Sequence, residues 1–387
     1  MEYKKLSEVC DVRDGTHDSP KYVTEGYPLV TSKNIVDGKL DLSVINYLSQ
    51  EDYDKINERS KVDVGDIIMP MIGTIGNPYI VEDFIDFAIK NVALVKFPYD
   101  SINNRYVWYY LKSESFNRYV AEKNKGGTQK FLSLGDIRSL NIPVINKNEQ
   151  AEIVELLDKV SSIIDLRKDE LIKLDELIKA RFVELFGDAV DNPMGWEKKQ
   201  LQEIVTDDCT ISYGIVQTGD DQEEGVPVFR PVDIVNRVPK LNELKKTTKE
   251  ISNKYKRTIL KGREMLITVR ANIADTCIVG EEFRGCNVGR GIVPIRTRED
   301  VIVLEFLKYL MDSKHLNDVI KSKAKGITLI QLNMEDLREV ELIIPPIEQQ
   351  KAFVEFAEQV DKSKVIVQKS LEETQVLFDS LMQEYFG

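Results

Sequence analysis

The side chains that most often carry catalysis are scarce in this chain. It has two histidines, His17 and His315, which lie in different halves of the sequence. No Ser-His-Asp or Cys-His arrangement can be assembled from them, and no group of residues has the spacing of a metal site. Four cysteines form no C-x-x-C pair and are expected to be reduced and mostly buried: Cys10, Cys209, Cys277 and Cys286. The sequence therefore indicates no catalytic centre.

Two glycine-containing stretches could suggest cofactor chemistry but lack its spacing. The segment GNPYIV at 76–81 has one proline where the Asn-Pro-Pro-Tyr motif of amino-methyltransferases has two, and no glycine-rich cofactor loop precedes it. The segment RGCNVGRG at 284–291 does not match the G-x-x-x-x-G-K-[ST] pattern that binds phosphates. We interpret the first segment as a turn and expect the chain to bind no cofactor by itself.

Charge is distributed unevenly along the chain. The formal net charge is −12, yet residues 225–330 carry 21 Lys and Arg against 12 Asp and Glu, a local charge of +9. Segments 149–188 and 348–387 carry −5 and −4. A basic segment of this size can bind the DNA backbone even in an acidic protein. Charge alone is equally consistent with a randomly uneven surface.

Length and composition are those of a globular protein with more than one domain. The chain has 387 residues, of which 42% are hydrophobic and 30% charged. Its first residues, MEYKKLSEVCDVRDG, lack the apolar stretch of a secretory signal. No apolar run approaches the roughly 18–20 residues that span a bilayer. We therefore expect a cytoplasmic protein without a membrane partner.

The sequence repeats itself after 200 residues. Residues 125–187 align with 325–387 without a gap, and 15 of the 63 pairs are identical, including Gln150 with Gln350. Weaker matches lie upstream, where KKLSEV at 4–9 corresponds to KQLQEI at 199–204, and GYPLVTSKNI at 26–35 to GVPVFRPVDI at 225–234. The chain is therefore two copies of one unit.

Each copy ends in a long segment with helical periodicity. Apolar residues recur at alternating steps of four and three, which is typical of helices that pair as a coiled coil. The predicted pairing positions are Ile153, Leu157, Val160, Ile164, Leu171, Leu174 and Ile178 in the first copy, and Phe353, Val360, Val367, Leu371 and Phe378 in the second. Asn146 with Glu149, and Pro345–Pro346, suit the two helix starts. Two amphipathic helices docked separately on their own domains remain an alternative.

The connections between the copies predict an architecture. The linker GDAVDNPMGWE after the first helix is short, so the second helix must run back antiparallel to share a seam with the first. The remaining segments mix short β-rich runs, such as GDIIMPMI and EMLITVRA, with the helical stretch RYVWYYLKSESFNRYVAEK. We therefore predict an α+β protein in which two tandem globular domains are joined by two long antiparallel coiled-coil helices, with a pseudo-twofold internal repeat.

The order domain, helix, domain, helix resembles the specificity (S) subunit of type I restriction–modification enzymes over essentially the whole chain. The stretches that carry the resemblance are IIPPIEQQKAFV and its copy IPVINKNEQAEIV, the helix endings ELFGD and EYFG, the entry NPMGWEKKQL, and KGGTQKFLSLGDIRSLNIP. The first helix copy departs from the pattern, because Ile145 and Asn146 stand opposite Pro345 and Pro346.

The resemblance implies a division of the chain and a set of partners. It implies target-recognition domains at 1–145 and 189–345, and conserved spacer helices at 146–188 and 346–387. Each domain would read one half of a bipartite site in double-stranded DNA. The helices would set the gap and bind two modification (methyltransferase) subunits, which restriction subunits join. S-adenosylmethionine is then expected only on the modification subunits, and the chain itself is expected to be non-catalytic.

Residues for DNA contact are sought among polar and basic side chains in loops. The candidates in the first domain are Lys33, Asn34, Asn91, Lys125, Thr128, Gln129 and Lys130, and those in the second are Arg230, Arg237, Arg270, Asn272, Asn287, Arg290, Lys325 and Thr328. Two other functions stay open at this point. The chain could be a stand-alone DNA-binding regulator with two reading heads, or a scaffold whose basic second domain binds an acidic protein.

Overall fold

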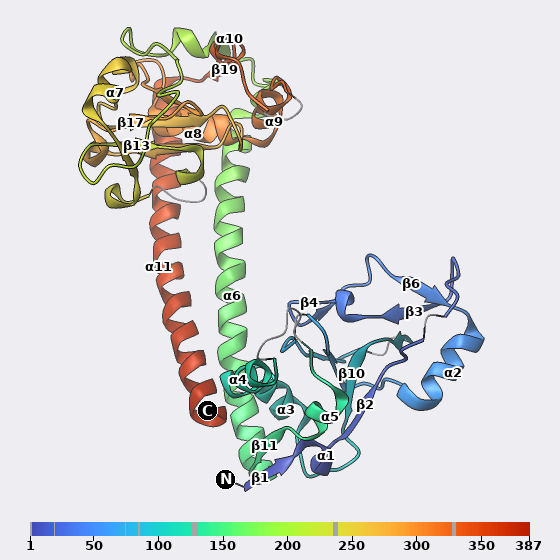
Figure 1. Ribbon diagram of the computed structural model, residues 1–387. Helices are drawn as coiled ribbons and strands as arrows, with labels where there is room; N and C mark the ends of the chain where they lie inside the picture. The colour runs from blue at the N-terminus through green and yellow to red at the C-terminus, as the bar shows by residue number, and fades with distance from the viewer. Residues whose placement is uncertain are drawn as a thin grey trace. The chain divides into compact units, whose positions relative to one another are not determined.

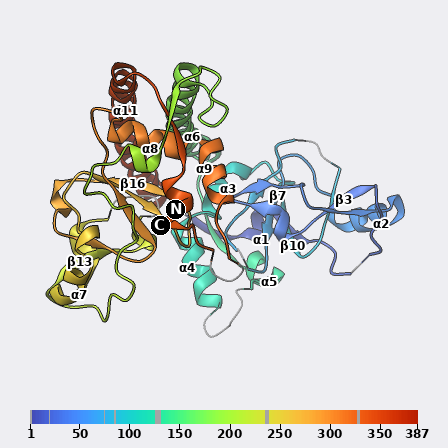
Figure 2. The same ribbon diagram turned by 90° about the horizontal axis from the view of Figure 1, so that it is seen from above.

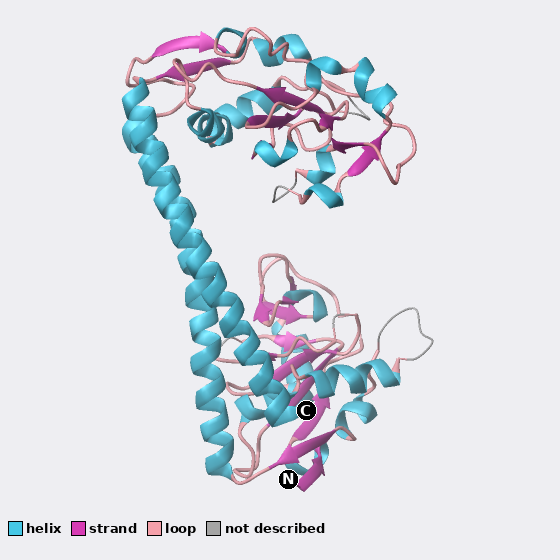
Figure 3. Cartoon of the chain, turned by 90° about the vertical axis from the view of Figure 1, so that its left-hand side faces the viewer, coloured by secondary structure: helices cyan, strands magenta, loops and turns pink. Residues whose placement is uncertain are grey.

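The computed structural model describes residues 2–18, 20–73, 75–83, 86–124, 131–234, 239–326 and 330–387. The chain divides into two compact units, Met1–Asp169 with Gln368–Gly387 (the first unit) and Glu170–Val367 (the second unit). Two long helices contribute to both units, and each is continuous: α6 (Lys147–Phe186) and α11 (Ile347–Phe386) (Figures 1 and 3).

The first unit is built on a four-stranded antiparallel sheet. Its order is β2-β10-β7-β8, with β2 (Asp11–Asp14), β10 (Val92–Lys96), β7 (Ile67–Pro70) and β8 (Tyr79–Ile80). Figure 2 labels β7 and β10 of this sheet. Ile67, Ile68 and Met69 are fully buried, because both faces of β7 are covered. A second sheet has the order β6-β3-β9, with β6 (Asn46–Leu48), β3 (Tyr27–Val30) and β9 (Ala88–Ile89), and its β3–β9 pair is parallel.

Shorter elements complete the first unit. Strand β1 (Glu2–Lys5) pairs with β11 (Asn141–Val144), and β4 (Ile35–Val36) pairs with β5 (Lys39–Leu40). The helices are α1 (Leu6–Val9), α2 (Gln50–Ser60), α3 (Asn104–Tyr110), α4 (Glu114–Lys123) and α5 (Leu134–Arg138), with the 3-10 turn η1 (Ser32–Asn34). The stretch expected as one helix is thus divided between α3 and α4, because the Ser113 hydroxyl accepts the Phe116 N–H and starts a new helix.

The second unit has the same plan. One sheet has the order β16-β15-β18, with β16 (Thr276–Val279), β15 (Glu264–Thr268) and β18 (Ile292–Ile295). The other has the order β14-β13-β17, with β14 (Lys245–Thr247), β13 (Val226–Phe229) and β17 (Asn287–Val288), and its β13–β17 pair is parallel. Strand β12 (Glu197–Gln200) pairs with β19 (Glu341–Ile344).

Helices and 3-10 turns fill the rest of the second unit. The helices are α7 (Lys249–Lys254), α8 (Leu304–Asp312), α9 (Lys314–Ser322) and α10 (Met334–Arg338). The turns are η2 (Leu201–Glu203), η3 (Pro231–Asp233), η4 (Leu241–Glu243), η5 (Lys256–Thr258) and η6 (Glu281–Phe283). No helix in the described ranges combines the length and apolar character needed to cross a bilayer.

The internal repeat extends to individual hydrogen bonds. The loop after β7 accepts a backbone N–H in the first unit (Leu132 N to Met71 O, 2.9 Å), and the loop after β15 does the same in the second (Leu332 N to Val269 O, 3.0 Å). Two further bonds recur in the same way. The Leu6 N–H donates to the Leu140 carbonyl in the first unit, as the Leu201 N–H does to the Val340 carbonyl in the second. The Arg138 side chain donates to the Val12 carbonyl, as the Arg338 side chain does to the Ile211 carbonyl. The two copies therefore share one framework.

The long helices pack against each other within each unit. In the second unit the Phe182 ring lies 5.4 Å from that of Phe353, and Asp175 pairs with Lys364 at 2.7 Å. The residue that comes later on α11, Lys364, contacts the residue that comes earlier on α6, Asp175, so the two helices are antiparallel. All twelve predicted pairing positions are buried or half-buried. In the first unit, Leu157 belongs to the same core cluster as Met382.

A buried glutamine fastens the start of each long helix to its globular part. Gln150 and Gln350 are fully buried. The Gln350 side chain accepts the Val303 N–H at 3.0 Å and donates to the Pro345 and Val301 carbonyls. Gln150 makes the matching bonds, accepting the Asn103 N–H at 2.8 Å. Both helix entrances are thus alike, although the first copy lacks the double proline.

This arrangement predicts a position-specific loss of stability. Gln350→Ala should lower the free energy of unfolding of the second unit by about 2–3 kcal/mol, because it leaves backbone groups of Val303, Pro345 and Val301 buried without partners. The neighbouring and exposed Gln349 provides the matched control, and Gln349→Ala should cost less than about 0.5 kcal/mol. Urea unfolding followed by circular dichroism compares the two variants. Equal losses would show that the hydrogen bonds of Gln350 do not fasten the helix.

Candidate nucleic-acid interface

The loop between β15 and β16 presents two polar side chains in a fixed conformation. Thr268 is fully buried and closes the loop, since its N–H donates to the Asp275 carbonyl at 2.9 Å and its hydroxyl accepts the Asp275 N–H at 3.0 Å. Ala271 and Ala274 have φ of 60° and 64°, a left-handed conformation that residues with a Cβ rarely adopt. Strained backbone of this kind is concentrated at functional sites. The loop holds Arg270 half-exposed and Asn272 exposed.

The turn between β17 and β18 lies directly against this loop. The Val269 N–H donates to the Gly291 carbonyl at 2.8 Å. A Cβ on Gly291 would lie 2.4 Å from Cγ of Pro231 and 3.4 Å from Cβ of Arg270, so the close approach requires glycine. The adjacent Arg290 is exposed. Two arginines that are 20 positions apart in sequence are thus carried on touching loops.

A third segment joins these loops through Gln331. The Arg270 guanidinium donates to the Gln331 side-chain oxygen. Lys325 and Gln331 exchange backbone hydrogen bonds of 2.9 and 3.0 Å, and the Lys325 ammonium lies 3.8 Å from Asp336. Three of the predicted contacts, Arg270, Arg290 and Lys325, are therefore brought together.

The arginines in this region differ in their availability. Arg230, at the start of η3, is held by both carboxylate oxygens of Asp233 at 2.7 and 3.0 Å, so its charge is compensated locally. Within the ranges that the structure describes, neither Arg270 nor Arg290 forms an ion pair. They can donate to phosphate oxygens or to the acceptor edge of guanine.

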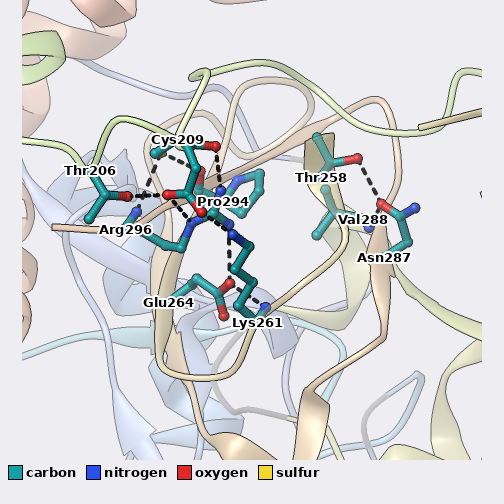
Figure 4. A network of polar contacts seen from close by, with 10 residues as sticks. Thr206, Cys209, Thr258, Lys261, Glu264, Asn287, Val288, Pro294 and Arg296 are labelled. Atoms are coloured by element: carbon teal, nitrogen blue, oxygen red, sulfur yellow. Dashed lines mark hydrogen bonds and ion pairs between the residues drawn. The ribbon is translucent and has the colours of Figure 1, made fainter. Parts of the chain in front are cut away.

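A buried polar network supports the strands that carry these loops (Figure 4). Arg296, at the end of β18, donates to Glu264 at the start of β15 at 3.2 Å, and its Nη2 donates to the Asp208 carbonyl at 2.8 Å. The Lys261 N–H donates to the same Glu264 oxygen at 2.6 Å. Glu264 is fully buried, so the network fixes the spacing of β15 and β18 rather than offering a binding group.

Two predicted DNA contacts are corrected by their burial. Asn287 is fully buried, and its side chain accepts from the Thr258 hydroxyl at 2.7 Å (Figure 4). It also donates to the Ser252 hydroxyl at 3.0 Å. Asn34 is also buried, and it donates to the Asp41 and Val44 carbonyls. Their polar atoms hold loops together, so neither side chain can reach DNA.

The remaining predicted residues are placed as follows. Lys33 is exposed in η1, and Asn91 is half-exposed in the turn between β9 and β10, where its φ is 56°. Six predictions lie outside the described residues: Lys125, Thr128, Gln129, Lys130, Arg237 and Thr328. Gln331 was not predicted. Its counterpart after the 200-residue shift is Phe131, so the repeat gave no signal for a polar role.

Nucleophilic chemistry finds no support in the cysteines. All four are free and buried, as expected from the sequence. Burial raises the pKa of Cys10 and of Cys277 to about 12 and that of Cys286 to about 11, so these thiols stay protonated at neutral pH. The segment GNPYIV, expected as a turn, begins in a turn at Gly76 and then forms β8.

One group of possible metal ligands comes together in the described part of the chain, although sequence spacing did not predict it. Donor atoms of Asp188, Asp191 and His315 lie within 4.8 Å of one another. Asp188 already accepts the N–H groups of Val190 and Asp191 and faces His315 at 2.9 Å. These contacts describe a capped turn after α6.

Comparisons with known proteins agree with this organisation. The family model described as "Type I restriction modification DNA specificity domain" matches residues 1–176 and 193–375. The EcoBI specificity subunit of Escherichia coli is 25% identical over 294 residues, which are 70% of this chain and 61% of the subunit's own length. The putative MjaX specificity subunit of Methanocaldococcus jannaschii is 23% identical over 96% of this chain and 89% of its own length.

Solved structures share the fold over the full chain. A chain from work on the complex assembly and conformational transition of the type I R-M system has a TM-score of 0.62 and 18% identity, with 100% of this chain and 97% of that chain covered. The S subunit from M. genitalium has a TM-score of 0.56 and 15% identity, with 100% and 96% covered. The chain therefore belongs to the family of type I restriction–modification specificity subunits and contains two copies of the DNA specificity domain.

Proposed function

We propose that this chain is the DNA-recognition subunit of a type I restriction–modification complex. The globular part of each unit reads one half of a bipartite site in double-stranded DNA. The observation that carries the proposal is the pair Arg270 and Arg290, two arginines without carboxylate partners in the described ranges, on touching loops of a framework that occurs twice. Basic charge supports it, since residues 225–330 have a net charge of +9.

The two copies differ where their loops meet. In the second unit the backbone of Arg270 forms a β-bridge with that of Gln331. The equivalent β-bridge in the first unit joins Ile72 to Phe131. The turn that carries Arg290 is one residue longer than the turn that carries Asn91. Residues 289–291 connect β17 to β18, whereas residues 90–91 connect β9 to β10. A shared framework with different loop side chains is what reading two different half-sites requires.

The long helices offer surfaces for partner subunits. In the first unit, Leu156, Ile163 and Leu166 lie on one face of α6, with exposed fractions of 37%, 44% and 63%. In the second unit, Val365 and Ile366 of α11 are 70% and 71% exposed. Exposed apolar faces of helices are typical of interaction sites. We propose that two modification (methyltransferase) subunits dock there and that restriction subunits join the assembly.

S-adenosylmethionine binds the modification subunits, and this chain works in the cytoplasm without catalysing a reaction.

Half-site selectivity tests the reading role of the second unit. Arg270→Ala or Arg290→Ala, in complex with modification subunits, should weaken binding by about 1–3 kcal/mol if the arginine pairs with a guanine edge. Only the half-site read by the second unit should become more tolerant of substitution. Fluorescence anisotropy with duplexes altered in one half at a time measures this effect.

A matched charge change separates recognition from general attraction. Arg284 is exposed and paired with Glu281, so Arg284→Ala removes the same charge from the same unit. It should leave half-site selectivity unchanged. Equal weakening of both half-sites by Arg290→Ala would assign this residue to general backbone contact or to the fold, and would contradict a reading role.

A further inference from the structure

A second polar cluster occupies the first unit, formed by the loop at 14–18 and the end of α2. The loop runs along the turn between β9 and β10, since the Gly15 N–H donates to the Val92 carbonyl and the Thr16 N–H to the Ile89 carbonyl, both at 3.0 Å. A Cβ on Gly15 would lie 2.3 Å from the Ile89 carbonyl oxygen. Glycine therefore permits the loop to lie against the turn that carries Asn91.

A buried carboxylate holds two exposed basic side chains in this cluster. Asp14 is 6% exposed. One of its oxygens faces Nε2 of His17 at 2.8 Å, and the other accepts from the Arg59 guanidinium. Arg13 donates to the Arg59 carbonyl at 2.9 Å and so ties the end of α2 to β2. The side chains of Arg59 and His17 are 66% and 62% exposed. Their polar ends are thus fixed in direction while they face solvent.

His17 is held in a setting that favours its charged form. Its Nδ1 lies 2.8 Å from the Asn91 side-chain oxygen, so an oxygen acceptor faces each ring nitrogen. These hydrogen bonds, to Asn91 and then to Asp14, raise the pKa of His17 above its usual value. Charged residues on the surrounding elements are Asp18 of the same loop, Lys90 of the β9–β10 turn and Arg59 of α2.

The second unit has different chemistry at the same place. Gly214 approaches Val288 as Gly15 approaches Ile89, since its Cβ would lie 1.8 Å from the Val288 carbonyl oxygen. The flanking Tyr213 and Val216 then occupy the positions of Asp14 and His17, and both are exposed. The oriented pair of basic side chains is therefore a property of the first unit.

We propose that Arg59 contacts the DNA of the first half-site and that the protonated ring of His17 adds positive charge beside it, with Asp14 as the positioning residue. This inference rests on the proposed function of the chain. Arg59 has further N–H groups to donate, and their targets are the acceptor oxygens and nitrogens of DNA, either the guanine O6 and N7 edge or phosphate oxygens. Both ring nitrogens of His17 already face protein acceptors, so His17 contributes the positive charge of its protonated form rather than a hydrogen bond. The two units thus use different loops of one framework, Arg270 and Arg290 in the second, and Arg59 and His17 in the first.

The test uses the complex of the full chain with modification subunits and the bipartite duplex that the wild-type complex methylates. Arg59→Ala should raise the Kd for this duplex about 10-fold. Lys55→Ala removes an exposed charge from the same helix, one turn earlier, and should change the Kd less than about 2-fold. Retained selectivity for the second half-site shows that the variants are folded and assembled.

Binding measurements with altered duplexes and at several salt concentrations identify the group on DNA that Arg59 contacts. If Arg59 contacts a guanine edge, the complex with Arg59→Ala should bind duplexes altered at one base pair of the first half-site as well as it binds the unaltered duplex. If it contacts phosphate, binding weakens alike on all first-half sequences, and the dependence of log K on log salt falls by about one. Either result supports the proposal.

The pH dependence of binding provides a readout that a purely structural role would not give. The imidazolium of His17 is present below its raised pKa, so binding through the first half-site should be strongest there and weaken as pH rises through that pKa. His17→Gln should remove this dependence, and the second half-site, which faces Tyr213 and Val216, should not show it.

Three results would overturn the inference. They are an unchanged Kd for Arg59→Ala, an equal loss for Lys55→Ala, and a pH profile of the first half-site that His17→Gln does not alter. In each case a wild-type complex that still selects a bipartite site leaves the proposed function intact. A wild-type complex that selects no bipartite site would instead refute the proposed function itself.

Discussion

A chain with one extra heptad after Leu171 and another after Leu371 should lose methylation at the native half-site spacing. Helices α6 and α11 each pass through both structural units, so each insertion lengthens a continuous helix by roughly 10.5 Å. Seven residues preserve the apolar seam. At about 3.4 Å per base pair, the preferred gap should grow by about three pairs. This expectation follows if helix length sets the gap between the half-sites, as the resemblance to specificity subunits implies.

Rotation of the DNA makes the effect large. Three pairs turn the second half-site by roughly 100° about the duplex, given 10–10.5 pairs per turn. Methyl transfer to duplexes whose gaps differ by one pair at a time measures the result, with the wild-type complex as reference. Any activity that survives in the insertion variant should keep both half-site sequences and require a longer gap. Full activity at the original gap would show that helix length does not set the spacing.

Loss of the Arg296 side chain should strongly destabilise the second unit. Its partner Glu264 is fully buried at the start of β15, and Arg296 itself is 11% exposed. Removing one member of a buried ion pair leaves an uncompensated charge and typically costs about 3–5 kcal/mol. Arg296→Ala should therefore lower the melting temperature of this unit by roughly 6–20 °C.

Two comparison variants identify the cause of this loss. Lys314→Ala breaks the exposed pair of Lys314 with Asp318 on α9 and should cost less than about 0.5 kcal/mol. The double variant Glu264→Gln with Arg296→Met removes both charges and should recover much of the stability lost in Arg296→Ala. Calorimetric melting compares all three. A double variant no more stable than Arg296→Ala would attribute the loss to packing rather than to the unpaired carboxylate.

The long helices could be predicted from sequence because their determinants are local and periodic. The seam positions recur every 3.5 residues on average, and the helix starts carry recognisable signals such as Asn146, whose side chain accepts the Glu149 N–H at 2.9 Å. The α+β character of the globular segments could be predicted from their mixture of short β-rich runs and helical stretches. The role of Gln150 and Gln350 was not predicted, because their hydrogen bonds join them to backbone roughly 47 residues away.

The candidate interface was predicted less completely, since side-chain direction depends on tertiary contacts. Asn287 and Arg290 are three residues apart in one glycine-rich stretch, yet one is buried at a strand pair and the other exposed on a turn. The hydrogen bond between the side chains of Arg270 and Gln331 spans 61 positions, so no local sequence pattern could predict it. The buried pair Glu264–Arg296 has a counterpart in Asp66–Lys96, but the residue types differ in both members.

Genome-wide methylation mapping tests the central claim most directly. A host without other modification systems would express the cognate modification subunit either with this chain or alone. We predict that co-expression methylates one sequence, made of two specific halves separated by a fixed and unspecific gap, and that the modification subunit alone leaves it unmethylated. Methylation of the same sequence without this chain, or of one uninterrupted sequence with it, would contradict the account.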